Sequence, residues 1–159
     1  MWEKTEKVIN DYGVALRNAY QDNLIKNGRI ATGDLLNGVD LVIKKDNVSI
    51  KLYFDLADYW KYVEYDTKPH FPPVDKIREW IRVKPVLPDD RGGRLPTPDQ
   101  LAYLIGRKIS VEGTKGSHDL GDAQERVFAE FEEALSEALM EDVMSEFDLV
   151  VQSFYRTLT

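Results

Sequence analysis

The feature that most constrains this chain is a long helical pattern near its C-terminus, from about residue 123 to residue 158. Large apolar residues recur there at three- and four-residue steps, which predicts an amphipathic helix. About 35 residues at 1.5 Å each would span roughly 50 Å, more than the ~30 Å of a small domain. We therefore expect this helix to project from the domain, to break near Met144 and Ser145, or to pack on a neighbouring subunit. The apolar residues of the pattern are Phe128, Phe131, Leu135, Leu139, Val143, Phe147, Val150 or Val151, Phe154 and Leu158.

The first third of the chain predicts a helix followed by a β-hairpin. Apolar residues keep helical spacing over residues 4–26, and Asn27 and Gly28 supply a left-handed stop. Apolar and polar residues then alternate over about residues 39–55, with residues 45–47 as the turn. This alternation predicts an antiparallel pair of strands with one buried face and one solvated face.

Residues 58–84 concentrate aromatic residues and prolines. We expect the segment near 59–65 to form a third strand or extended edge of the sheet. Pro73 suits the first position of a following helix, which must end before Pro85. The apolar residues of that helix, which we expect in the structural core, are Ile77, Trp80 and Ile81.

A loop and a second amphipathic helix follow. Residues 85–96 contain three prolines and two glycines, which predicts a flexible loop. Thr97 and Gln100 form a capping-box pattern with a proline at the first helical position. The helix that they open carries apolar residues as far as about Val111, and Gly113 ends it.

Several residues in these segments are of the types that anchor protein interfaces. Trp, Tyr and Arg are enriched among the residues that dominate binding energy. For the aromatic residues the alternative is ordinary core packing. The two arginines lie at the tip of the 85–96 loop, and this loop could order against a neighbouring protein or a phosphate group. The alternative is that the loop is disordered at the surface. The candidate interface residues are Arg91, Arg94, Tyr59, Trp60, Tyr62 and Phe71.

The sequence offers no persuasive catalytic, metal-binding or cofactor-binding constellation. It has no cysteine, so disulfides and zinc–thiolate sites are excluded. Its two histidines, His70 and His118, fall in separate loops without a carboxylate at helical metal spacing. The nucleotide-binding and hydrolase motifs are also missing. We therefore predict a non-enzymatic protein without a cofactor.

The net charge of −7 is unevenly distributed. Residues 112–159 carry 12 acidic and 3 basic side chains. This excess argues against sequence-independent binding of nucleic acid, and a solvated helix face explains it most simply. Glu132, Glu133, Glu141 and Asp142 are expected on that wet face. The charged N-terminus does not read as a signal peptide, and no apolar stretch approaches the ~18 residues of a membrane span.

Together these patterns predict a single α+β domain over residues 1–159, with a small antiparallel sheet and long terminal helices. The ordered set of motifs resembles the head–tail joining proteins of tailed bacteriophages, the neck and tail-completion family. That family has a V-E-x-G-T-x-P segment, an I-x-x-W-I helix and an I-x-R-K-I-x-x-x-G-T-K-G run. The matching stretches here are residues 63–69, 77–81 and 105–116, in the same order. One difference is Asp66, which stands where the family usually has glycine; Asp tolerates a positive φ better than most residues.

The resemblance implies a structural role in the virion, at the head–tail junction. It implies a homo-oligomeric ring, assembled in the host bacterial cytoplasm, that joins the portal or its adaptor to the tail and surrounds the DNA channel. DNA would pass through without sequence-specific binding, and no membrane is involved. The acidic C-terminal third would then suit a lumen that repels DNA phosphates.

Two other classes of function stay open at this point. The first is a non-virion assembly chaperone or adaptor for phage head or tail proteins. The second is an enzyme acting on phosphorylated ligands, in which Arg91, Arg94 and Lys115 would bind the anion. No general base or nucleophile accompanies these three residues in the sequence, so the enzyme class is the weakest of the three.

Overall fold

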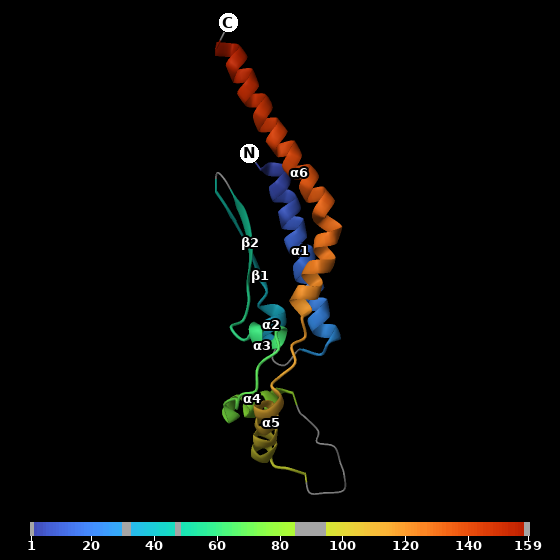
Figure 1. Ribbon diagram of the computed structural model, residues 1–159, viewed down its shortest axis with the longest axis vertical. Coiled ribbons are helices and arrows are strands. Elements are labelled where there is room, and N and C mark those ends of the chain that lie inside the picture. Colours follow the sequence, from blue (N-terminus) through green and yellow to red (C-terminus); the bar gives the residue numbers. More distant parts are fainter. Residues whose placement is uncertain (1, 30–32, 47–48, 85–94, 158–159) are drawn as a thin grey trace.

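The computed structural model describes residues 2–29, 33–46, 49–84 and 95–157. This part of the chain forms six helices and one two-stranded antiparallel sheet, so the predicted α+β class is confirmed. The molecule is elongated, with α1 and α6 side by side along its length and α4 and α5 at the end away from the C-terminus (Figure 1). The elements are α1 (Glu3–Lys26), α2 (Asp34–Asn37), β1 (Asp40–Lys45), β2 (Ile50–Asp55), α3 (Trp60–Glu64), α4 (Val74–Val83), α5 (Pro98–Glu112) and α6 (Asp119–Thr157).

The main core lies where α1 and α6 pack against each other in antiparallel directions. Among the buried α1 residues, Leu16, Tyr20 and Leu24 recur at four-residue steps, so they share one face of the helix. Tyr12, one turn earlier, contacts Phe128 and Phe131 of α6 edge-to-face, at centroid distances of 6.4 and 5.8 Å. The buried cluster consists of Leu16, Tyr20, Leu24, Leu35, Val39, Ala123 and Val127.

The predicted hairpin is confirmed as the pair β1 and β2. Leu41 pairs with Phe54, and Ile43 pairs with Leu52, so these four side chains share the inner face. This face packs on α1 at the buried Gly13, where an added Cβ would lie 2.6 Å from Cδ1 of Leu52. A glycine at this position therefore lets the sheet approach the helix closely.

The prediction of a third strand near residues 59–65 is wrong, because this segment forms the short helix α3. Within the described residues the sheet has only β1 and β2. Trp60 and Val63 are three residues apart and both pack against the core, whereas Tyr59, Tyr62 and Tyr65 are exposed. This is helical spacing, and the alternation expected of a strand is missing.

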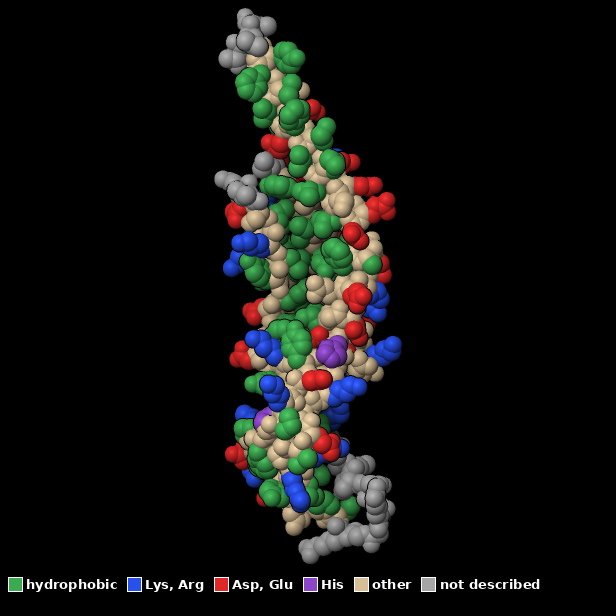
Figure 2. All heavy atoms as spheres, viewed as in Figure 1, with side chains coloured by type: hydrophobic (Ala, Val, Ile, Leu, Met, Phe, Trp, Pro, Cys, Tyr) green, Lys and Arg blue, Asp and Glu red, His purple; other side chains and the backbone are tan. Residues whose placement is uncertain are grey.

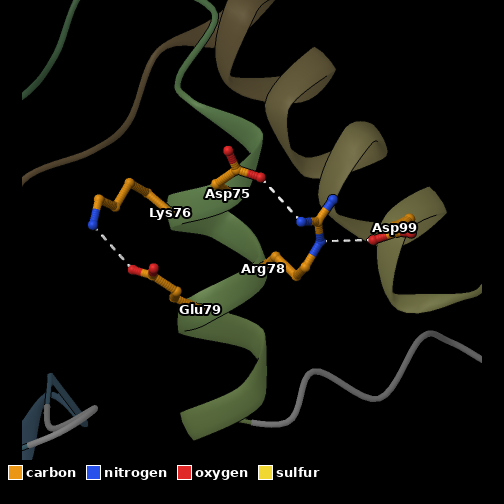
Figure 3. Close-up of polar contacts among 5 residues, drawn as sticks. All are labelled: Asp75, Lys76, Arg78, Glu79 and Asp99. Atoms are coloured by element: carbon orange, nitrogen blue, oxygen red, sulfur yellow. Dashed lines mark hydrogen bonds and ion pairs between the residues drawn. The ribbon is translucent and has the colours of Figure 1, made fainter.

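A second, smaller packing unit consists of α4 and α5. Buried Ile77 packs beside Gly106, whose lack of a side chain leaves room for it. Arg78 joins the two helices, since it donates to Asp75 at 3.0 Å and to Asp99 of α5 at 2.7 Å (Figure 3). The predicted capping box opens α5 as expected, and α5 ends at Gly113.

Of the three residues predicted in the core around α4, only Ile77 is fully buried. Ile81 is half-buried, and the prediction for Trp80 is wrong, because Trp80 is 40% exposed. Ile77 and Ile81 are four residues apart and share the side that faces α5, whereas Trp80 is rotated by about 60° from Ile77. The apolar pattern of α4 thus wraps around more of the helix than α5 covers.

The C-terminal helix α6 is longer than its sequence pattern predicts. It begins at Asp119 rather than near residue 123 and continues without a break through residues 144 and 145. The 85–96 loop, with Arg91 and Arg94 at its tip, falls almost entirely outside the described residues. None of the described helices is both long enough and apolar enough to cross a membrane.

Candidate interaction surface

A buried carboxylate holds the start of α6 against α3. Glu64 is only 3% exposed, and its two carboxylate oxygens accept hydrogen bonds from the backbone N–H groups of Leu120 and Gly121, both at 2.9 Å. Helix N-termini have unpaired N–H groups and a partial positive charge, which a carboxylate satisfies. Glu64 therefore acts as a cap supplied by a distant part of the chain.

The two motifs that carry the family resemblance meet at the same junction. Thr67 and Thr114 form an isolated antiparallel bridge, and Asp66 accepts a hydrogen bond from the Gly116 N–H at 2.8 Å. The glycines allow this approach: a Cβ on Gly116 would lie 2.3 Å from the backbone oxygen of Glu64, and one on Gly113 would lie 2.0 Å from that of Thr67.

Asp66 fits this junction without the positive φ that a glycine at this motif position would allow. The described non-glycine residues with positive φ are Trp2 and His118, so Asp66 has an ordinary negative φ. Its side chain instead supplies an acceptor to the facing loop. The departure from glycine at this position thus adds a hydrogen bond across the junction.

The opposite end of the α1–α6 pair is fixed by Asp142. Its carboxylate accepts hydrogen bonds from the backbone N–H groups of Lys4, at 3.3 Å, and Thr5, at 2.8 Å. Trp2, at the N-cap of α1, provides no side-chain cap, so Asp142 of α6 takes that role. Burial opposes ionisation of Asp142, but the hydrogen bonds from α1 outweigh it, and the pKa lies below its ordinary value. The prediction that Asp142 lies on the wet face is therefore wrong.

Beyond Asp142, α6 continues without α1 beside it. Residues 143–157 extend past the start of α1 by roughly 22 Å at 1.5 Å per residue (Figure 1). Apolar side chains run along this projecting end (Figure 2). We define the distal stripe as Met140, Met144, Phe147, Val151 and Phe154, which follow one another at steps of four, three, four and three residues. Apart from the half-buried Val151, its members are between 53 and 67% exposed.

The distal stripe lies on the side of α6 away from α1. With about 100° between successive residues, the α1-facing Ala138 and Asp142 lie roughly 160–200° around the helix from Met140. Nearer the N-terminus of α6, the side that the stripe occupies carries acidic residues instead, namely Glu130, Glu133 and Glu137. The distal stripe is therefore a separate apolar face and no simple extension of the α1–α6 seam.

The aromatic residues predicted at an interface do not gather on one surface. Trp60 packs against the core and against Tyr65, Tyr62 is exposed, and Phe71 lies beside Gly106 and Tyr103 near α5. Tyr59 lines a cavity of about 190 Å³ together with Trp80. The predicted arginines, Arg91 and Arg94, lie outside the described residues.

The distal stripe is the surface that the sequence interpretation missed. The predicted helical pattern includes Phe147, Val150 or Val151, and Phe154, but it groups them with residues that face α1, such as Phe131. A sequence signal for the stripe does exist. Met140 and Met144 begin a second series of four- and three-residue steps, on the side of the helix opposite the α1-facing residues. Comparison of the chain with protein-family models, curated proteins and solved structures gives no match to any of them.

Proposed function

We propose that this chain is a structural subunit of a homo-oligomeric ring at the head–tail junction of a tailed bacteriophage. In this role it joins the portal or its adaptor to the tail and surrounds the DNA channel. The ordered motifs that resemble the neck and tail-completion family motivate the choice of particle. The contact between residues 63–69 and 113–116 supports the resemblance, because it gives both motifs one shared structural purpose.

The observation that carries the self-association part of the proposal is the distal stripe. Full burial of one large apolar side chain contributes roughly 1.5–3 kcal/mol relative to exposure. The stripe leaves several such side chains in water on a helix that extends beyond its own domain. Steps of four and three residues are typical of a seam between helices or between a helix and another flat surface. A subunit contact along α6 would remove this apolar surface from water.

Self-association is tested by one pair of matched substitutions on the projecting helix. Phe147→Glu places a charge in the stripe, whereas Leu149→Glu places the same charge about 200° away on the same helix. Leu149 is also exposed, at 57%. Sedimentation velocity over a concentration series should show oligomers for the unsubstituted chain and Leu149→Glu, and monomers for Phe147→Glu. Equal sedimentation of the two variants would remove the stripe from the proposal.

The location in the virion is tested by quantitative mass spectrometry of purified particles. A ring subunit should be present at a ring-like copy number, far below that of the capsid protein. If the chain is made in infected cells and missing from particles, it is instead an assembly chaperone or adaptor for other head or tail proteins. In that case the exposed aromatic residues of α3, such as Tyr62, become the first candidates for the contact.

A further inference from the structure

The outer face of the β1–β2 hairpin carries a pattern that the fold of the single chain does not use. Val42 pairs with Tyr53 across the strands, and Lys44 pairs with Lys51 next to them. All four side chains are exposed. Like charges directly opposite each other destabilise an antiparallel pair. The lysine pair therefore disfavours the isolated hairpin, and an anionic partner would relieve the repulsion.

No described carboxylate lies within ion-pair distance of Lys44 or Lys51. The neighbouring Lys45 differs, since it contacts Glu6 of α1 at 2.5 Å. Lys44 instead lies over the Tyr53 ring, 5.7 Å from its centroid, so the cation and the apolar pair form one continuous surface. This surface is basic at one end and apolar in the middle, and the exposed pair Asp40 and Asp55 makes its other end acidic.

The complementary surface occurs on α6 of the same chain. Glu133 and Glu137 lie on the same side of the helix as Met140 and Met144 and directly precede them. Along the helix, Glu137 and Met140 are about 4.5 Å apart, and along β2, Lys51 and Tyr53 are about 7 Å apart. The spacing from charge to apolar group therefore differs by about 2–3 Å between the two surfaces. Flexible lysine and glutamate side chains span the remainder.

These two surfaces point away from each other within one subunit. The hairpin and α6 lie on opposite sides of α1 (Figure 1); Figure 2 shows basic and acidic side chains along the hairpin edge and mostly Asp and Glu side chains along the α6 edge. They therefore meet most simply between two copies. A contact between two different surfaces of identical subunits is heterologous, and such contacts generate closed rings when the rotation closes.

We propose that the outer face of the hairpin of one subunit docks on α6 of the next copy, across the boundary between its acidic and apolar parts. Lys44 and Lys51 pair with Glu133 and Glu137, and Val42 and Tyr53 cover Met140 and Met144. This inference rests on the proposed self-association and names the surfaces that make it. It also assigns part of the acidic excess to a subunit contact rather than to a channel lining.

The inference is tested by charge reversal on each surface and on both together. The first double variant is Lys44→Glu with Lys51→Glu, which keeps a like-charged pair across the strands, so the hairpin itself changes little. The second is Glu133→Lys with Glu137→Lys, and the fourfold variant combines them. Lys108→Glu with Lys115→Glu is the control for net charge, because both lysines are exposed and lie outside the hairpin. Circular dichroism checks the fold of each variant before sedimentation velocity measures its association.

We expect each interface double variant to weaken self-association by about tenfold or more, and the fourfold variant to restore it. The control pair should associate like the unsubstituted chain. Oligomers that are insensitive to both interface reversals would overturn the hairpin contact and leave the ring proposal standing. A fourfold variant no better than the double variants would also overturn it. An unsubstituted chain that stays monomeric throughout would instead overturn the self-association on which both proposals rest.

Discussion

The two halves of α6 both carry large apolar residues but have opposite surroundings. Residues 119–142 lie against α1 and carry the buried Ala123, Val127 and Ala138. Residues 143–157 extend past α1, and their apolar side chains are mostly exposed. The buried side of the first half and the distal stripe are about 180° apart around the helix. One continuous helix thus contributes to the domain core with one face and presents a separate surface with the other.

Helical periodicity therefore identifies a helix without identifying what each face of it contacts. Truncation of side chains in a seam that stabilises the monomer should lower the unfolding free energy of the monomer. Truncation of side chains in a seam that binds a partner should leave the stability of the monomer unchanged and should weaken the assembly. Substitutions on the two halves of α6 and at its fixed ends separate these cases.

The largest effect is expected for Phe131→Ala in the first half of α6. Phe131 packs edge-to-face on Tyr12 of α1, at 5.8 Å between ring centroids. Replacement of a core phenylalanine by alanine typically costs ~3 kcal/mol or more through lost burial and a residual cavity. Urea unfolding of the dilute monomer should show a loss of about 3 kcal/mol. A change below about 0.5 kcal/mol would mean that the contact with α1 does not hold this half of the helix.

A somewhat smaller loss is expected for Glu64→Ala at the start of α6. This change removes the acceptor of the Leu120 and Gly121 N–H groups in a buried place. Hydrogen bonds to charged groups contribute roughly 1.5–3 kcal/mol, so we expect a loss of about 2 kcal/mol. Glu64→Gln is the matched control, because it retains one acceptor oxygen and nearly the same shape. Faster hydrogen exchange at the two amides should accompany the alanine variant; unchanged exchange would contradict the capping role.

Asp142 should contribute about 1 kcal/mol, in a pH-dependent way. It caps α1 from α6, and loss of a helix cap typically costs ~1 kcal/mol. Its pKa in the folded chain is below the ordinary value of 3.8, because hydrogen bonds from α1 outweigh the effect of burial. The charged form is therefore favoured by folding, and its contribution is complete above that ordinary pKa and is lost as the pH falls through the folded pKa.

The corresponding measurement is the stability difference between the unsubstituted chain and Asp142→Asn as a function of pH. The asparagine variant keeps an acceptor oxygen but does not titrate. The difference should be constant near neutral pH and shrink as the pH falls below about 4. A difference that grows on acidification would show that Asp142 is not held in its charged form by the start of α1.

Local sequence signals predicted most of the elements and the ends of α5. The capping box at Thr97 and Gln100 and the terminating Gly113 act over a few residues, so they can be read from the sequence. The hairpin followed from alternation in the same way. The segment 59–65 was misread because its aromatic density favours a strand by propensity, whereas burial of Trp60 and Val63 selects helical spacing.

The residues that fix α6 could not be predicted, because their contacts are not local. Asp142 caps a helix start 137 residues away, and Glu64 caps one 56 residues away. The local sequence around each of them is typical of an exposed acidic residue, and only the tertiary contact shows that it is buried. The exposure of Trp80 has the same origin, since it depends on which side of α4 meets α5. Periodicity predicted the helices, but the distal stripe depends on where α1 lies: α1 begins beside Asp142 and so leaves the rest of α6 without a partner helix.

The smallest loss of monomer stability is expected for Phe147→Ala, the counterpart of Phe131→Ala on the same helix. Phe147 is 60% exposed and has no α1 residue beside it, so its truncation removes little burial from the monomer. Urea unfolding of the dilute monomer should change by less than about 0.5 kcal/mol. The same variant should lower the oligomeric fraction in sedimentation velocity, because the stripe loses its largest central side chain. If Phe147→Ala costs as much monomer stability as Phe131→Ala, the second half of α6 folds back onto its own domain, and the contrast between the two halves is lost.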